Sequence, residues 1–507
     1  MITLEKRVRE ILLENRKSGR GLRRFSALFT LIFAMPIFAS DTLTIPPLRL
    51  TSYLGKLPKS VAIMTASETE RKGLLLRSEP SIEVANFQNL ISLDLLQIYQ
   101  LAKDEDATYA VARAEFTGNR EKVSQARAGY LPILNASASV AKAVNAQQGL
   151  PRSRYASDGY SISLMQPLIR PQVWANFRQA KQQVLQAEHK LSAANQELIL
   201  RVAKAYFDVL LAQDNVKVSQ AQKTAFERQL EQARKTFEVG TTTITDANEA
   251  QAKYDQAVAK EIADQNDLRI KSDVLRQIIA KVPPRLSSLR DNVTFDQFVS
   301  DNLNEWEKTA ETDNQTIAIS KADAEIAKLE VTKQRAGHLP VLDLIMSYTD
   351  NRNGIGNIFG GRADFRSTQI GLQLTIPFYS GGGVSSKVSE ALALQQRAQS
   401  DLEQKRRDSL QAVRTAFLGV NSGASKIKSL EQAVKSSQVS YESTKLGREV
   451  GVRTTIDLLN AEQQVFEAQR DLSQAKYELL INRLNLLASA GKLTEEDITK
   501  LNDIFEK

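Results

Sequence analysis

Apolar residues follow a helical spacing through the longest stretches of the chain. Over about 173–238, positions such as Phe177, Ala180 and Val184 recur at alternating steps of three and four. This spacing is typical of a coiled-coil seam, and one additional four-residue step interrupts it as a stutter. A second stretch of this kind precedes residue 450. Each is predicted to form a helix of about 65 residues, on the order of 100 Å long.

Four shorter segments alternate between apolar and polar residues with a period of two. In the first of them, Leu134, Ala136 and Ala138 alternate with Asn135 and Ser137. One apolar and one polar face over about ten residues is typical of a transmembrane β-strand between lipid and water. The predicted strands cover about 133–142, 159–167, 341–350 and 367–378.

Two similar turns, at 239–246 and 450–457, each separate two long helices. Gly240 and Gly451 suit helix ends, because glycine accepts a left-handed backbone. Asp and Thr residues follow, and their side-chain oxygens suit the start of the next helix. The two turns lie about 210 residues apart, and helices and strands precede both in the same order, which indicates a tandem repeat.

The N-terminus resembles a secretion signal. Residues 1–24 are polar and basic, and 25–39 form an apolar run of about 15 residues, which is short for a bilayer span and fits a signal peptide. A buried helix is the alternative. The predicted organisation is a signal peptide at 1–39, an irregular N-terminal extension at 40–91, a first structural repeat at 92–284, a second at 285–490 and a polar C-terminal tail at 491–507.

Composition excludes several classes of function. The chain has no Cys, which removes disulfides, thiol catalysis, Cys metal sites and a lipid-anchor Cys, and it has only two His. Of the net charge of +8, residues 1–39 carry +5, so the remaining +3 is too small to argue for nucleic acid. No nucleophile–base set, metal-ligand cluster or Gly-rich phosphate loop is evident. We expect no enzyme activity, no cofactor and no metal.

Four strands per chain do not close a barrel, and their open edges are not tolerated in lipid. Three copies supply twelve strands, and cyclic symmetry closes them. The helices then form a soluble coiled-coil body on one side of the membrane. The predicted fold class is therefore a mixed α and β membrane protein with a transmembrane β-barrel.

The order of these features resembles the TolC family of outer-membrane efflux and secretion channels over nearly all of residues 92–490. The motifs that carry the resemblance are the two Leu-Pro junctions (Leu131-Pro132 and Leu339-Pro340), the strand exit at 376–382 and the two Val-Gly turns. The resemblance implies a homotrimer with a twelve-stranded barrel on a long periplasmic α-helical tunnel. Such a channel is a passive exit duct in the outer membrane of a Gram-negative bacterium.

The resemblance also implies site residues at the turns. Arg453 matches the gate arginine, Thr245 its partner, Asp246 the acid of the first hairpin and Asp457 an acid of the constriction ring. The turns themselves are the expected adaptor-docking sites: Val239, Gly240, Thr241, Val450, Gly451 and Val452.

Two positions depart from the family pattern. Arg448 stands where an aromatic gate residue is expected, and Asn460 where a second ring acid is expected. An Arg448–Asp246 ion pair is a candidate replacement for the aromatic link. Simple helix capping by Asp457 and a solvated surface charge at Arg453 are the alternative interpretations.

The expected partners are outer-membrane lipid, a periplasmic adaptor protein and an inner-membrane pump, either an ABC or a proton-driven pump. The Val-Gly-x-Arg-Thr turn favours the branch that serves type I protein secretion and multidrug pumps. A periplasmic coiled-coil adaptor or scaffold without its own pore is the alternative function. The exported cargo stays open at this point, because the pump selects it.

Overall fold

The computed structural model describes residues 93–145, 153–241, 243–282, 285–290, 293, 295, 302–353 and 363–505. The expected signal peptide and N-terminal extension at 1–91 lie outside the described residues, as do the segments 146–152 and 354–362 between paired strands.

One order of elements occurs twice along the described chain. The first set is α3 (Leu95–Glu105), α4 (Ala107–Ala128), β1 (Ile133–Asn145), β2 (Ser153–Ile169), α5 (Pro171–Glu238) and α6 (Ile244–Ile279). The second set is α7 (Leu303–Asp313), α8 (Gln315–Arg335), β3 (Val341–Asn353), β4 (Ala363–Thr375), α9 (Gly383–Glu449) and α10 (Thr455–Ser489). A 3₁₀ turn, η4 (Ala336–His338), leads into β3, and α11 (Glu495–Asn502) follows α10.

The strands form one antiparallel sheet in the order β1-β2-β3-β4. Leu134 pairs with Leu164, Leu164 with Met346 and Met346 with Ile370, so the apolar positions share one face. That face leaves large side chains uncovered, as at Leu134 and Leu372, which are 64% and 66% exposed. The other face carries hydroxyl and amide groups.

Proline residues explain two differences from the expected strand ends. β2 continues past Pro167 to Ile169, with a shift of register between these two residues. A bulge tolerates the missing N–H of proline. β4 ends at Thr375, before Pro377, rather than at 378. A strand residue without an N–H cannot donate to the ladder.

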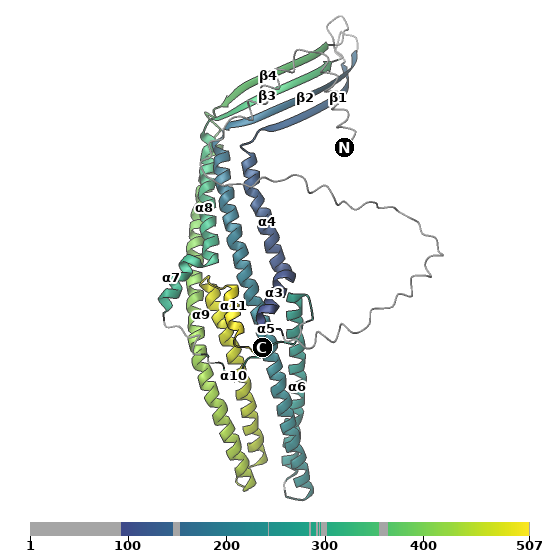
Figure 1. The fold of residues 1–507 in the computed structure, drawn as a ribbon, viewed down its shortest axis with the longest axis vertical. Coiled ribbons are helices and arrows are strands. Elements are labelled where there is room, and N and C mark those ends of the chain that lie inside the picture. The colour runs from purple at the N-terminus through teal and green to yellow at the C-terminus, as the bar shows by residue number, and fades with distance from the viewer. Residues whose placement is uncertain are drawn as a thin grey trace, which may run out of the picture. The chain divides into compact units, whose positions relative to one another are not determined.

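α5 and α9, with 68 and 67 residues, organise the helical part. α5 packs against α4, α6, α8 and α10, whereas α9 packs against α8 and α10. Buried small residues such as Ala180, Ala187 and Ala205 line α5. Figure 1 shows the sheet at one end of these helices and the turns of the α5/α6 and α9/α10 hairpins at the other. None of the helices in the described part combines the length and hydrophobicity that crossing a membrane requires.

Aromatic residues from distant parts of the chain form the centre of the main core. Phe207 stacks on Phe505 with ring centroids 6.0 Å apart, and Tyr206 meets Phe505 edge-on at 5.6 Å. The Tyr206 hydroxyl donates to the Ser287 carbonyl at 2.8 Å. Leu289 pairs with Phe505 in an antiparallel bridge. The C-terminal segment thus completes this core.

The C-terminal segment differs from the polar tail expected at 491–507. It contains α11, whose Ile498 and Leu501 are buried, and Phe505 is 1% exposed. The apolar residues Ile498, Leu501, Ile504 and Phe505 recur at steps of three, three and one. Four apolar residues are too few to give a recognisable periodicity in the sequence. In the structure they nevertheless pack against the main core.

Candidate functional site

The α5/α6 turn is fixed by backbone and side-chain hydrogen bonds. Gly240 has a φ of +79°, and its N–H donates to the Phe237 carbonyl at 2.9 Å. Thr243 caps α6 and forms a capping box with Asp246. The Asp246 N–H donates to the Thr243 hydroxyl at 3.2 Å, and the Thr243 hydroxyl donates to Asp246 Oδ2 at 2.8 Å. Asp246 therefore serves the start of its own helix.

The α9/α10 turn repeats this geometry. Gly451 has a φ of +81°, and Val452 N–H donates to the Gly447 carbonyl at 2.9 Å. Thr454 N–H and the Thr454 hydroxyl donate to Asp457 Oδ2 at 3.0 and 2.8 Å. Like positions of the two hairpins thus have like roles, as the similar turn sequences predict.

Capping also sets the charge of Asp457. The backbone N–H and hydroxyl of Thr454 hold the pKa of Asp457 below its usual range, and Arg453 contributes in the same direction. The carboxylate is therefore ionised at neutral pH and lies at the positive end of α10. Helix capping, the simpler of the two interpretations of Asp457, is confirmed. Capping does not exclude a position on a pore axis in an assembly.

Arg453 and Thr245 project from the turns into solvent. Arg453 lies close to Gly447, because a Cβ at that position would be 2.8 Å from Arg453 Cγ. Three apolar side chains beside them are also exposed: Val239 by 73%, Val450 by 67% and Val452 by 75%. The turns therefore combine exposed hydrophobic side chains with charged ones.

Arg448 makes a contact other than the one expected. Its Nη1 donates to Gln229 Oε1 of α5 at 3.1 Å, and no Arg448–Asp246 ion pair forms within the described part of one chain. Asp246 already accepts hydrogen bonds from Thr243. Because Gln229 belongs to α5 and Arg448 to α9, this hydrogen bond still links the two hairpins near their turns. Asn460 is exposed on α10.

Further contacts between the hairpins lie beyond the turns and had no signal in the sequence. Lys253 Nζ donates to Gln463 Oε1 at 2.7 Å, between α6 and α10. Tyr477 donates to Asp214 Oδ2 at 3.0 Å, between α10 and α5. Each pair joins residues more than 200 positions apart. Lys253, Gln463 and Asp214 are ordinary residue types for solvent-facing helix positions, and Tyr477 is a buried core residue, so the sequence does not mark these pairs.

One acid of α10 is buried beside this region. Glu462 is 9% exposed, and its Oε2 has no hydrogen-bond partner among the described residues. Burial raises the pKa of Glu462, while Tyr441 and Lys445 of α9 act in the opposite direction. A buried carboxyl with a raised pKa costs free energy when it ionises.

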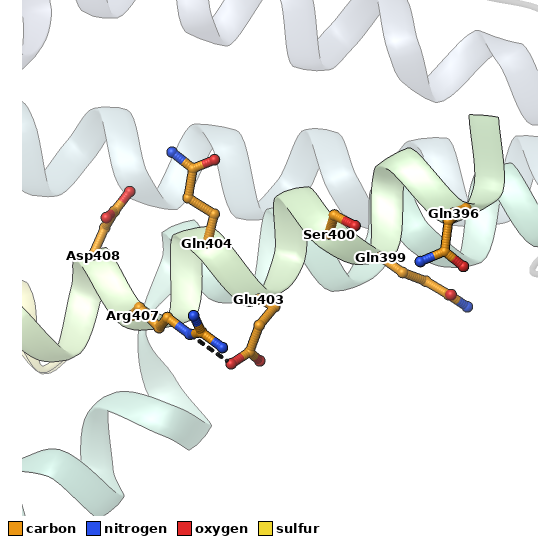
Figure 2. Close-up of a pocket in the computed structure, with 7 residues that line it drawn as sticks. All are labelled: Gln396, Gln399, Ser400, Glu403, Gln404, Arg407 and Asp408. Atoms are coloured by element: carbon orange, nitrogen blue, oxygen red, sulfur yellow. Dashed lines mark hydrogen bonds and ion pairs between the residues drawn. The ribbon is translucent and has the colours of Figure 1, made fainter. Parts of the chain in front are cut away.

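A surface groove lies elsewhere, along α9. It has a volume of about 490 Å³ and is lined by Gln396, Gln399, Ser400, Glu403, Gln404, Arg407 and Asp408. Figure 2 shows these side chains along a single helix, with Arg407 paired to Glu403 at 2.9 Å. The groove is open and polar. No group of three or more His, Cys, Asp or Glu in the described ranges is arranged to hold a metal ion.

Comparisons with known proteins agree with this architecture. The family model described as "outer membrane efflux protein" matches residues 98–281 and 306–492. Outer membrane protein TolC of Vibrio cholerae is 31% identical over 411 residues, which cover 81% of this chain and 93% of TolC. The proteases secretion protein PrtF of Dickeya chrysanthemi is 29% identical over 451 residues, or 86% of this chain and 96% of PrtF.

Solved structures share the fold at lower identity. The crystal structure of the Campylobacter jejuni CmeC outer membrane channel has a TM-score of 0.70 at 15% identity, and the match covers 88% of this chain and 97% of that one. The family model matches more than half of the chain, in both of its halves. This protein therefore belongs to the outer membrane efflux protein family, the TolC family of outer-membrane channels.

Proposed function

We propose that three copies of this chain join their sheets into a twelve-stranded transmembrane β-barrel. The observation that carries the proposal is the sheet itself. Within the described residues β1 and β4 are each paired on one side only, and one face exposes apolar side chains over most of its length. An open edge in lipid leaves backbone N–H and C=O groups without partners. Closure by identical copies satisfies both edges at once.

The long helices, which we interpret as the larger part of an internal tandem repeat, extend this barrel as a periplasmic tunnel. The trimer acts as a passive exit duct, in line with a family of transport channels rather than enzymes. A periplasmic adaptor and an inner-membrane pump deliver the substrate. The name of PrtF refers to protease secretion, which favours type I secretion through an ABC pump over a proton-driven pump.

The tunnel is gated at the turns. Arg453 is the charged link between neighbouring hairpins, with Thr245 as its partner. Asp246 is the acid of the first hairpin, and Arg448 adds the link to Gln229. Three Asp457 carboxylates around a narrow axis attract cations. Because Asn460 carries no charge, this ring has one acid per chain.

The exposed valines at the turns form the docking surface for the adaptor. Val239, Val450 and Val452 are each more than two thirds exposed. Apolar side chains of this size at a helical tip gain free energy when a partner covers them. Gly240, Thr241 and Gly451 keep the turn narrow, so that a partner can approach closely.

Planar-bilayer recording tests barrel and gate together. Wild-type protein should migrate as a heat-sensitive trimer and give a small conductance. Arg453→Ala should raise the single-channel conductance several-fold, whereas Arg397→Ala, on the exposed side of α9, should not. Absence of both trimers and channels would contradict the barrel, and a conducting trimer unaffected by Arg453→Ala would contradict the gate alone.

Docking is tested by in-cell crosslinking from a photoreactive residue at Thr241 or Val452. Capture of an adaptor together with an ABC ATPase would indicate type I secretion, and capture with a proton-driven pump would indicate drug or metal efflux. Val111, exposed on α4, is the matched control position. Equal capture from Val111 would contradict docking at the turns.

A further inference from the structure

The apolar face of the sheet becomes charged toward the strand ends that lie away from the helices. Tyr160 and Tyr348 lie on this face with ring centroids 5.9 Å apart. Beyond them on the same face, Asp350 is opposite Arg366 and Asp158 is opposite Arg352. Aromatic residues followed by charged residues mark the boundary between hydrocarbon and headgroups in outer-membrane proteins.

A buried acid holds the two arginines in place. Asp350 is 3% exposed and accepts a hydrogen bond from Arg366 Nε at 2.9 Å. Arg352 Nε lies 3.9 Å from Asp350 Oδ1, and Arg352 Nη1 lies 4.0 Å from Asp158 Oδ2. The side chains of Arg366 and Arg352 nevertheless remain 68% and 47% exposed.

The contacts with Asp350 therefore orient the two arginines but leave some of their N–H donors for another ligand. A guanidinium group has five N–H donors in a planar fork, and the Arg366–Asp350 hydrogen bond uses Nε alone. The terminal nitrogens of Arg366 can bind a second anion, together with Arg352, whose Nη1 also lies near Asp158. Paired N–H donors of this geometry match phosphate oxygens.

The position of the pair matches the headgroup level of one leaflet. At the other edge of the apolar band, Phe378 and Tyr379 are 92% and 88% exposed. On β4, Thr368 lies opposite Tyr348, ten residues before Phe378. Seven of these ten residues, up to Thr375, belong to β4 and extend over roughly 23 Å along the strand. The three residues that lead on to Phe378 bring the distance to the order of the apolar band of outer-membrane barrels, about 25 Å tall. Arg352 and Arg366 lie just outside that band.

A further basic residue lies on this face. Lys142 of β1 lies on the same face of the sheet as Leu134 and is exposed. Basic residues beside a membrane surface attract anionic headgroups.

We propose that Arg352 and Arg366 bind the phosphate groups of a phosphorylated glycolipid in the leaflet far from the helices, which is the outer leaflet. The inference rests on the proposed barrel, because the barrel places this face toward lipid. Asp350 is a positioning residue, and Tyr160 and Tyr348 contact the sugar or the upper part of the acyl chains. The bound lipid thus reinforces the upper rim of the channel.

The test uses the purified trimer in a nonionic detergent and bisphosphorylated lipid A as the probe, with bound lipid measured by native mass spectrometry. The variant Arg352→Gln/Arg366→Gln/Asp350→Asn removes both cations without leaving Asp350 as an unpaired buried charge. We expect lipid A to bind it at least about tenfold more weakly. Arg397→Gln/Arg407→Gln on α9 removes equal positive charge and should bind as wild type.

Further measurements distinguish a specific lipid site from general attraction between charges. Fully dephosphorylated lipid A should bind weakly to every protein, and excess inorganic phosphate should not displace lipid A from wild type. Arg352→Gln alone should give a partial loss, which keeps the test valid where the triple variant does not assemble. Equal binding of both lipid forms, displacement by free phosphate, or an equal loss in the α9 control would each overturn the lipid site in a trimer that still conducts. A wild-type protein without trimers or channels would instead overturn the proposed function.

Discussion

Arg470 of α10 lies with Nη2 3.5 Å from Oδ2 of Asp264 on α6, so the two helical hairpins of one chain are joined by an ion pair. Asp264 is 6% exposed. Within the described residues neither Arg470 Nη2 nor Asp264 Oδ2 makes a hydrogen bond. Lys260 Nζ lies 2.9 Å from the other carboxylate oxygen of Asp264, Oδ1. A buried pair of this kind is often no more stabilising than apolar residues of similar volume, but removing one partner of the pair is costly. Such a contact suits a link that separates in the proposed opening of the turns.

Arg470→Ala should therefore ease separation of the hairpins. Loss of the cation removes the attraction between α6 and α10, while Lys260 still neutralises Asp264. We expect more frequent openings in planar bilayers and a loss of about 1–3 kcal/mol in the free energy of unfolding. A double-mutant cycle with Asp264→Asn isolates the pair. Additive effects of the two substitutions would show that the residues do not interact.

The cap at the α9/α10 turn predicts a pH dependence of tip order. The folded pKa of Asp457 is depressed by Thr454, so its stabilising effect is present above the unfolded pKa of about 3.9 and is lost as pH falls through the lower folded value. Hydrogen exchange at residues 454–458 should therefore accelerate only in strong acid. Thr454→Val should accelerate it already at neutral pH, and Thr499→Val in α11 is the control. Unchanged exchange in Thr454→Val would contradict the role of the cap.

Buried Glu462 predicts the opposite pH dependence. Its folded pKa is raised by burial, so ionisation destabilises the fold progressively as pH rises from the unfolded value through the folded one. Glu462→Gln should raise the thermal midpoint by a few degrees at about pH 8 and leave it unchanged at about pH 4. Glu467→Gln, exposed on the same helix, should show no such difference. A pH-independent effect of Glu462→Gln would indicate a packing change instead.

The C-terminal segment should be required for the stability of the helical core. Phe505 is buried between Phe207 and Tyr206, and replacing a buried phenylalanine with alanine costs about 3–5 kcal/mol. Phe505→Ala should lower the denaturant midpoint accordingly. Phe378→Ala makes the same chemical change at a side chain that is 92% exposed, so it should have little effect in detergent. Equal midpoints for the two variants would refute a structural role of the segment.

Much of this architecture follows from local patterns. Helix and strand periodicities depend on which side chains share a face, and they predicted all four strands and both long hairpins. The turn chemistry is equally local, because glycine at positive φ and a Thr–Asp capping box involve residues within a few positions. The strand limits were less accurate, since pairing with neighbours decides how far a strand extends around a proline.

The contacts between distant segments were decided only by tertiary structure. Arg448 reaches Gln229 rather than Asp246, and Arg470 reaches Asp264, because the rotation and spacing of packed helices determine which polar side chains meet. The position of Phe505 in the core likewise depends on a gap left by other elements. A sequence specifies each helix face through its own spacing, whereas the choice of partner across two faces is a property of the packed assembly.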